Sequence, residues 1–280
     1  MDQRLSEVTT KLVQQLQLFM EESRITETEL SKALQLLTEV GQHNEFQLLS
    51  DVLGISVLVD NITHGVESDG IVTDHNVLGP LYREEAPFME LPAVICREDE
   101  EGTPLYISGQ VISAATGAPL ANAIVDVWQA NEKGYYENQD EDQPDFNLRG
   151  RMRTDEQGRY EIRTIVPGPY DIAKGGPVGR LLHALGRHDW RPAHIHFKVS
   201  CEGHVPLTTM LFVPGDPYLG SDAIGAVKHS LIMNMERHDD PEQIQERGLN
   251  KPFCTCRYDF KLKQPQSVGK PKLASEGSAL

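Results

Sequence analysis

Short segments of alternating apolar and polar residues, separated by turn signals, recur from residue 105 to residue 263, and they constrain the fold more than any other feature. Side chains alternate between the two faces of a strand, so such segments bury one face against a second sheet. Short strands at this spacing are typical of a β-sandwich. The predicted strands lie at residues 105–113, 124–128, 159–163, 193–200, 208–213 and 257–263.

The first 65 residues are predicted to be helical. Leu5, Val8 and Leu12 follow the spacing of one helix face. Thr26-x-x-Glu29 is a capping box that begins a second helix, which Gly41 is expected to end in a left-handed conformation. A third helix is predicted from residue 44 towards residue 58. The fold class is therefore mainly β with an α-helical N-terminal layer: residues 1–65 form the helical layer, 66–265 the β-sandwich domain and 266–280 a loose tail.

The charge and the cysteines exclude several classes of protein. With 42 acidic against 26 basic residues and a net charge of -16, the chain lacks the excess of Lys and Arg that nucleic-acid binding requires. No segment reaches the roughly 18 uncharged apolar residues of a membrane span, and the first residues do not resemble a signal peptide. We therefore expect no membrane span and a cytoplasmic location. The four scattered cysteines are interpreted as reduced structural thiols: Cys96, Cys201, Cys254 and Cys256.

The segment Arg-Pro-Ala-His-Ile-His at residues 191–196 carries the strongest chemical signal. His194 and His196 would project from one face of a strand, about 7 Å apart. Two imidazoles at this spacing suit one metal ion, and a hydrogen-bonded surface pair is the alternative. Two tyrosines in turn-rich segments precede them, Tyr136 and Tyr170. Packed rings with satisfied hydroxyls are the alternative for both.

These four residues, with Leu-Gly-Pro-Leu-Tyr at 78–82 and Asp-Val-Trp-Gln-Ala-Asn at 126–131, resemble the intradiol ring-cleaving dioxygenases of the catechol and hydroxyquinol 1,2-dioxygenase group. The resemblance covers almost the whole chain. It implies one non-haem Fe(III) per chain, bound by Tyr136, Tyr170, His194 and His196, whereas Tyr135 is assigned to packing.

The resemblance also implies an activity. A catechol-type diol would be cleaved with O2 between its two hydroxyl-bearing carbons, giving an open-chain dicarboxylate. Tyr170 would leave the metal as the diol binds and take up a proton. Arg191 would stabilise negative charge that develops on the ring. A structural ion pair with one of the many acids is the alternative for Arg191.

By analogy with the family, eight residues line the substrate pocket. Asp51 would accept a hydrogen bond from the third hydroxyl of hydroxyquinol, although an acid on the helix surface is the alternative. Met210 stands where catechol-cleaving members tend to carry glutamine, which disfavours catechol. The substrate is thus hydroxyquinol (giving maleylacetate) or catechol (giving cis,cis-muconate), with chlorocatechol as the alternative. The predicted pocket residues are Leu48, Asp51, Val77, Leu78, Pro80, Ile172, Met210 and Ile224.

The resemblance further implies a homodimer formed through the N-terminal helices, with a phospholipid at the dimer interface. Two interpretations of another class stay open on the residues alone. One is a non-catalytic, transthyretin-like or immunoglobulin-like β-sandwich that binds a ligand. The other is a zinc hydrolase that uses His194 and His196, for which no third ligand is evident in the sequence.

Overall fold

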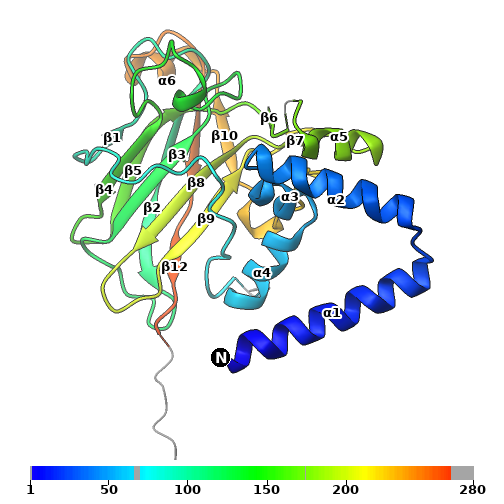
Figure 1. Cartoon of the computed structure of the whole chain (residues 1–280). Coiled ribbons are helices and arrows are strands. Elements are labelled where there is room, and N and C mark those ends of the chain that lie inside the picture. The colour runs from blue at the N-terminus through cyan, green and yellow to red at the C-terminus, as the bar shows by residue number, and fades with distance from the viewer. Residues whose placement is uncertain (1, 66–69, 174, 266–280) are drawn as a thin grey trace, which may run out of the picture. The chain divides into compact units, whose positions relative to one another are not determined.

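A computed structural model describes residues 2–65, 70–173 and 175–265 (Figure 1). The chain divides into two compact units. The helical unit comprises residues up to 49 together with 173–187, and the β unit comprises 50–172 and the residues from 188 onward. The predicted boundary at residue 65 stays a prediction, and the predicted tail at 266–280 lies outside the described residues.

The helical unit is built from three helices, α1 (Gln3–Ser23), α2 (Glu27–Gln42) and α5 (Pro177–Ala184). The predicted capping box is confirmed, since the Glu29 carboxylate accepts the Thr26 N–H at 2.8 Å and the Thr26 hydroxyl accepts the Glu29 N–H at 3.3 Å. Glu45 accepts the N–H of Val178 at 2.9 Å at the start of α5. No residue of α1 is buried.

Two helix predictions were wrong. Gly41 does not end α2 but lies inside it, where an added methyl group would stand 3.1 Å from the Phe46 ring. The left-handed residue is instead Asn44, with φ 56°. The single predicted third helix is two helices, α3 (Phe46–Val52) and α4 (Ile55–His64), which Gly54 separates with φ 71°. A glycine adopts this backbone conformation without strain, so the chain bends there by 76°.

The described residues hold no single helix that is long and apolar enough to cross a membrane. Among these residues, only α3 and α4 taken together have the length and composition of a membrane span, and this pair is bent by 76°.

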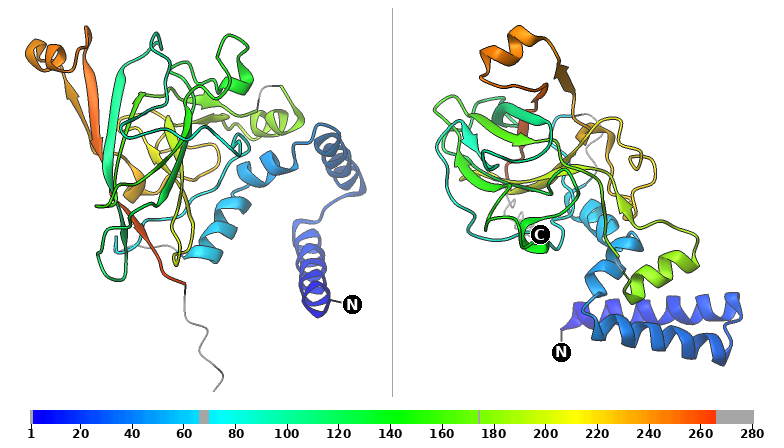
Figure 2. Two further views of the ribbon diagram at one scale, coloured as in Figure 1. Left: turned by 90° about the vertical axis from the view of Figure 1, so that its left-hand side faces the viewer. Right: turned by 90° about the horizontal axis from the view of Figure 1, so that it is seen from above.

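The β unit holds two main sheets (Figures 1 and 2). One is six-stranded in the order β1-β5-β2-β11-β10 with β12 also paired to β2, the second is four-stranded in the order β4-β3-β8-β9, and β6 and β7 form a separate pair. The strands are β1 (Ala93–Val94), β2 (Pro104–Ser113), β3 (Ile124–Gln129), β4 (Arg149–Arg153), β5 (Arg159–Ile165), β6 (Tyr170–Asp171), β7 (Trp190–Arg191), β8 (His194–Ser200), β9 (Leu207–Phe212), β10 (Met235–His238), β11 (Phe253–Arg257) and β12 (Phe260–Leu262). The remaining elements are the 3-10 helices η1 (Glu137–Gln139) and η2 (His229–Leu231) and the helix α6 (Pro241–Glu246).

The predicted β-sandwich is confirmed by a shared core between the two main sheets. Ile195, Phe197 and Val199 of β8 are fully buried in this core. The Phe197 ring lies 5.0 Å from the ring of Phe260 on β12 of the other sheet. Because side chains alternate along β8, His194 and His196 project from the opposite face, away from the sandwich core.

The strand predicted at residues 257–263 covers only the last residue of β11 and the whole of β12, and both of these short strands pair in parallel with β2. The interruption lies opposite Gly109, where an added methyl group would overlap the carbonyl oxygen of Tyr258. Gly109 therefore allows the Tyr258 backbone to approach β2 closely. The Asp259 carboxylate accepts the N–H of Gln110 at 2.9 Å in the same place.

All four cysteines are free thiols, as the sequence predicted. Cys254 and Cys256 are buried on β11 and contribute to the sandwich core. Burial raises the pKa of the Cys256 thiol to about 11. These cysteines therefore act as small apolar side chains.

Candidate active site

Strand register assembles one side of the candidate site. His196 on β8 lies opposite Trp128 on β3 and opposite Met210 on β9. In the separate two-stranded pair, Tyr170 on β6 lies opposite Arg191 on β7. Backbone hydrogen bonds thus place Trp128, His196 and Met210 side by side on one sheet. They place Tyr170 beside Arg191 in the separate strand pair.

The two histidines converge more closely than the sequence predicted. Their ring centroids are 4.7 Å apart at an interplanar angle of 74°, and their Nε2 atoms are 3.1 Å apart. The predicted 7 Å is the spacing along the strand, whereas the rings turn toward each other. The Nδ1 atom of His194 lies 2.7 Å from the carbonyl oxygen of Pro192. Only a protonated Nδ1 can donate to this carbonyl, so the neutral ring carries a lone pair on Nε2.

Burial keeps both imidazoles neutral. It lowers the pKa of His194 and of His196 well below the usual value, and the nearby Arg191 guanidinium lowers both further. Trp128 stacks on the His196 ring with centroids 4.8 Å apart and planes 3° apart. On the segment before β1, a methyl group added at Gly79 would stand 3.3 Å from the His196 ring, so the backbone passes close to the imidazole. His196 is therefore fixed in orientation by its neighbours.

The two tyrosines meet beside the histidines. The Tyr170 hydroxyl lies 3.4 Å from His194 Nε2. The Tyr136 and Tyr170 rings are perpendicular, with centroids 5.6 Å apart. Tyr136 is fully buried, and burial together with the neighbouring Tyr170 phenol raises its pKa well above the usual value. Tyr135, which the sequence assigned to packing, is 39% exposed, so that assignment stays a prediction.

Two glycines let the tyrosine-bearing loops approach each other. A methyl group at Gly134 would stand 2.9 Å from Tyr170 Cβ, and the φ of Gly134 is 84°. A methyl group at Gly168 would overlap the carbonyl oxygen of Glu132. Any side chain at either position would push the loops apart and separate the two phenols.

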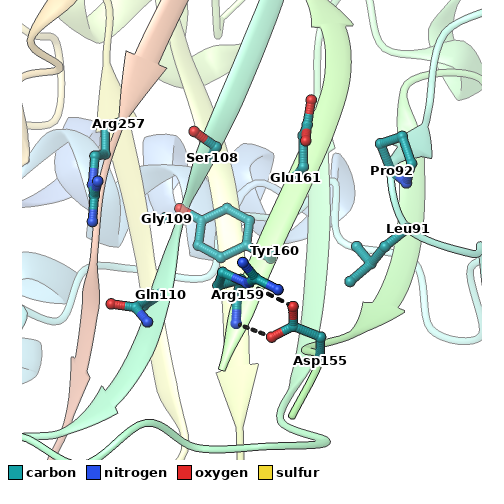
Figure 3. A pocket seen from close by; sticks show the side chains of 10 residues that line it. All are labelled: Leu91, Pro92, Ser108, Gly109, Gln110, Asp155, Arg159, Tyr160, Glu161 and Arg257. Atoms are coloured by element: carbon teal, nitrogen blue, oxygen red, sulfur yellow. Dashed lines mark hydrogen bonds and ion pairs between the residues drawn. The ribbon is translucent and has the colours of Figure 1, made fainter. Parts of the chain in front are cut away.

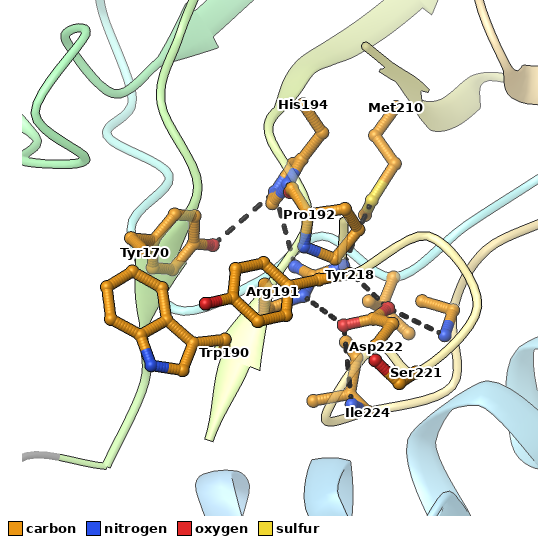
Figure 4. Close-up of polar contacts among 12 residues, drawn as sticks. Tyr170, Trp190, Arg191, Pro192, His194, Met210, Tyr218, Ser221, Asp222 and Ile224 are labelled. Carbon is orange, nitrogen blue, oxygen red and sulfur yellow. Dashed lines mark hydrogen bonds and ion pairs between the residues drawn. The ribbon is translucent and has the colours of Figure 1, made fainter. Parts of the chain in front are cut away.

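Arg191 is buried and contacts three side chains (Figure 4). Its Nη1 atom lies 3.2 Å from His194 Nε2, and its Nη2 atom lies 3.4 Å from the Met210 sulfur. Its Nε atom donates to Asp222 Oδ1 at 3.2 Å. Burial works against the charged guanidinium, but Asp222 and then the Tyr170 phenol keep the pKa of Arg191 above its usual value. The predicted alternative, an ion pair with an acid, is thus present, and the same guanidinium also faces the histidines.

The structure places some of the predicted pocket residues next to Arg191 and the two histidines. Met210 contacts Arg191, and the N–H of Ile224 lies 3.4 Å from Asp222 Oδ1 (Figure 4). Val77, Leu78 and Pro80 flank Gly79, which lies against His196. Ile172 follows Tyr170 by two residues, and its N–H donates to Asp189 O at 3.0 Å. Asp51 is buried, whereas Leu48 belongs to the helical unit and is half-buried.

Sequence reasoning gave no role to Asp222 or Trp128. Trp128 lies in a recognised motif, and its position opposite His196 follows from strand register. Asp222 lies in a loop rich in Gly, Pro and Asp, where no periodic pattern indicates which acid turns inward. The contact of Asp222 with Arg191 could therefore be found only from the fold.

The donor set fits a metal ion. The Nε2 atoms of the two neutral imidazoles are 3.1 Å apart. At this distance two nitrogen lone pairs would repel each other, so the two atoms either share a proton or bind a cation. Among the described residues, the buried Tyr136 hydroxyl and His196 Nδ1 have no hydrogen-bond partner. Phenolate oxygen and imidazole nitrogen together favour iron over magnesium or calcium.

A second group of side chains, Asp60, His64 and His75, brings three ligand-type atoms within 4.8 Å of one another. Its two imidazoles are parallel, with centroids 3.7 Å apart, and stack face to face. The Lys228 ammonium lies 3.3 Å from the Asp60 carboxylate. Face-to-face rings and an adjacent ammonium suit a metal ion less well than the converging rings of His194 and His196.

A hollow of about 460 Å³ lies on the outer face of the six-stranded sheet (Figure 3). Residues of β2, β5 and β11 line it, and Arg159 pairs there with Asp155 at 2.7 Å. The ten lining residues include no histidine or cysteine. This hollow therefore lacks the ligand chemistry of the histidine–tyrosine group.

Comparison with known proteins gives the family of the chain. Residues 77–264 match a family model described as "Dioxygenase", and residues 2–70 match "Catechol dioxygenase N terminus". Hydroxyquinol 1,2-dioxygenase of Rhizobium sp. (strain MTP-10005) is 43% identical over 268 residues, covering 93% of this chain and 90% of that protein. Catechol 1,2-dioxygenase of Acinetobacter baylyi is 35% identical, covering 97% and 91%. The solved structure of hydroxyquinol 1,2-dioxygenase from Pseudomonas putida DLL-E4 has a TM-score of 0.84 and 37% identity, covering 94% and 92%.

The fold and the histidine–tyrosine group define a class of protein, a β-sandwich enzyme of the ring-cleaving dioxygenase type. The chain belongs to the intradiol dioxygenase family, oxidoreductases that use non-haem iron and O2 to cleave aromatic diols. The predicted family, fold class and intradiol cleavage are therefore confirmed. A non-catalytic β-sandwich and a zinc hydrolase are both excluded as the family of this chain.

Proposed function

We propose that this chain is a hydroxyquinol-cleaving intradiol dioxygenase with one Fe(III), held by Tyr136, Tyr170, His194 and His196. The observation that carries the proposal is the convergence of the two histidine Nε2 atoms, 3.1 Å apart, with the Tyr170 hydroxyl 3.4 Å from one of them. The fully buried Tyr136, whose ring meets the Tyr170 ring at 5.6 Å, supports the fourth ligand.

When bound, ferric iron would draw electron density from a chelated diol and make its ring reactive toward O2. The protein's residues supply the rest. The two phenols suit a hard ferric ion. Tyr170 is less buried than Tyr136, which supports Tyr170 as the phenol that would take up a substrate proton. The Arg191 guanidinium is already aimed at His194 and would stabilise negative charge on the ring.

Hydroxyquinol is proposed as the preferred diol, with maleylacetate as its product. Three observations support it. Identity is 43% to the hydroxyquinol 1,2-dioxygenase of Rhizobium sp. against 35% to the catechol 1,2-dioxygenase of Acinetobacter baylyi. Asp51 is only 5% exposed, so it is not an acid on the helix surface. The Met210 thioether, a weak acceptor and no donor, stands beside Arg191.

The test is turnover by purified protein loaded with iron. We expect a reddish protein with one iron per chain, O2 consumption with hydroxyquinol, and a kcat/KM for hydroxyquinol at least about tenfold above those for catechol and chlorocatechols, which corresponds to one additional hydrogen bond to a charged group. A colourless iron-loaded protein would overturn the tyrosine ligands. A preference for catechol would contradict hydroxyquinol as the proposed substrate, and the product would then be cis,cis-muconate.

Asp51→Asn should separate the diols. If the carboxylate accepts a hydrogen bond from the third hydroxyl, kcat/KM for hydroxyquinol should fall about tenfold, since the amide oxygen can still accept and a hydrogen bond to a charged group exceeds a neutral one by about 1–1.5 kcal/mol. Catechol lacks that hydroxyl, so its kcat/KM should stay within about threefold. Asp60→Asn on α4 is the matched control. Equal losses on both diols would contradict the proposed contact.

A homodimer formed through the N-terminal helices is also proposed. The apolar stripe of α1 supports it, since Leu5, Leu12 and Phe19 are 63%, 56% and 55% exposed. Sedimentation velocity should show a dimer, and Leu12→Glu with Phe19→Glu should shift it to monomer, whereas Thr10→Glu with Gln14→Glu, on the opposite face of α1, should not. An unchanged dimer in the first variant would place the interface elsewhere. A phospholipid bound at this interface should appear in native mass spectra and be absent from the monomeric variant.

A cytoplasmic location belongs to the same proposal. Four free cysteines support it, because thiols stay reduced in that compartment. Cell fractionation should place the activity with cytoplasmic marker enzymes.

A further inference from the structure

The loop that joins β9 to η2 carries a buried carboxylate, Asp222, with a side chain 1% exposed. Its Oδ1 accepts from Arg191 Nε at 3.2 Å, and its Oδ2 lies 3.5 Å from Arg191 Nη2. The carboxylate therefore faces one edge of the guanidinium with both oxygens (Figure 4). This fork geometry fixes the plane of an arginine side chain.

Backbone groups hold the carboxylate in turn. Oδ2 accepts the N–H of Ala226 at 2.9 Å, and Oδ1 lies 3.4 Å from the N–H of Ile224. The N–H of Ala223 donates to the carbonyl oxygen of Trp190, at 3.1 Å, next to Arg191. Asp222 is thus anchored on its own loop and ties that loop to β7.

The other contacts of Arg191 cannot replace this carboxylate. Nη2 otherwise faces the Met210 sulfur at 3.4 Å, and a thioether is a weak acceptor. Nη1 lies 3.2 Å from His194 Nε2. If Nε and Nη2 lost the carboxylate, the guanidinium would be free to rotate, and Nη1 would move away from the histidine side.

We propose that Asp222 is a positioning residue that holds the Arg191 guanidinium in the plane needed for ring cleavage. This inference rests on the proposed function, in which Arg191 stabilises negative charge on the diol. Asp222 itself does not touch the substrate. Its effect passes through the direction in which Arg191 presents its N–H groups.

Asp222→Asn tests the inference in the iron-loaded enzyme. An amide turns one NH2 group toward the donors Arg191 Nη2 and Ala226 N–H, so the guanidinium must shift. We expect kcat to fall about 10- to 100-fold, as a displacement of about 1 Å in a catalytic group costs about that much. Iron content and the visible tyrosinate band should not change, and KM should stay within about threefold. Asp222→Glu, which keeps the charge, should recover part of the loss.

Asp216→Asn is the matched control. Asp216 lies on the same loop and accepts the N–H groups of Ala193 and Tyr218 at 3.0 and 2.9 Å, without a contact to Arg191 among its described hydrogen bonds. Its kcat per iron should stay near that of the unmodified enzyme. An equal loss in both variants, or a normal kcat for Asp222→Asn, would overturn the inference. If the unmodified enzyme cleaves no diol at all, the proposed function fails instead.

Discussion

Replacing His196 with alanine is expected to abolish diol cleavage by removing the iron. The imidazole supplies one of two Nε2 atoms that converge at 3.1 Å, and the methyl group of alanine offers no donor atom. A bound metal ion contributes several kcal/mol of transition-state stabilisation, so kcat/KM should fall by at least about 10³-fold. Iron per chain and the visible tyrosinate band should fall together, and both can be measured on the same sample.

His238→Ala is the control for this loss. His238 lies on β10 of the other sheet, partly buried, and stacks on Phe253 at 4.6 Å. This variant should keep its iron and its activity. Tyr170→Phe provides a second comparison, because it also removes cleavage yet leaves three ligands, so its iron content should fall less. Full activity in either His196→Ala or Tyr170→Phe would contradict the proposed ligand set.

If His196→Ala does not fold, His196→Gln preserves much of the side-chain volume under Trp128. Its melting temperature without iron should stay close to that of the unmodified iron-free protein, because the glutamine amide can replace the contact of His196 Nε2 with His194 Nε2, and Nδ1 has no hydrogen-bond partner among the described residues. Iron loss in a folded His196→Gln variant would attribute the effect to the donor atom. Normal iron content there would contradict His196 as a ligand.

The parts of this site that follow a strand could be predicted from the sequence. Alternation along β8 is a local property, so the common face of His194 and His196 follows from their spacing of two residues. The sequence also marks the turn-rich segments of the two tyrosines. Their meeting could not be derived locally, because it depends on Gly134 packing against Tyr170, a contact between segments 36 residues apart.

The errors share one physical cause. A glycine can end a helix, bend it or simply leave room for a ring, and only tertiary contacts decide which. Gly41 makes room for Phe46, whereas Asn44 takes the left-handed conformation that was expected of Gly41, and Gly54 bends the chain between α3 and α4. Asp222 was missed for a similar reason, since a loop acid turns inward only where the fold provides a cation such as Arg191.

Replacing Arg191 with methionine is expected to slow ring cleavage without removing iron. The guanidinium is a buried cation whose Nη1 lies 3.2 Å from His194 Nε2, and the loss of one preorganised donor typically lowers kcat about 10²- to 10³-fold. Stopped-flow reaction of the diol complex with O2 should show the loss in the steps after diol binding. Arg191→Lys keeps the charge but not the planar fork, so it should fall between the methionine variant and the unmodified enzyme.

The same substitution separates the catalytic role of Arg191 from its ion pair. Methionine leaves the Asp222 carboxylate buried without its cation, which should lower the free energy of unfolding by about 3–5 kcal/mol. The double variant Arg191→Met, Asp222→Asn removes that unpaired charge and should regain most of the stability, measured by denaturant unfolding of the iron-free forms. Its kcat should stay as low as that of Arg191→Met. If kcat recovered together with stability, Arg191 would be a structural ion-pair partner and the charge on the ring would have to be stabilised by another group.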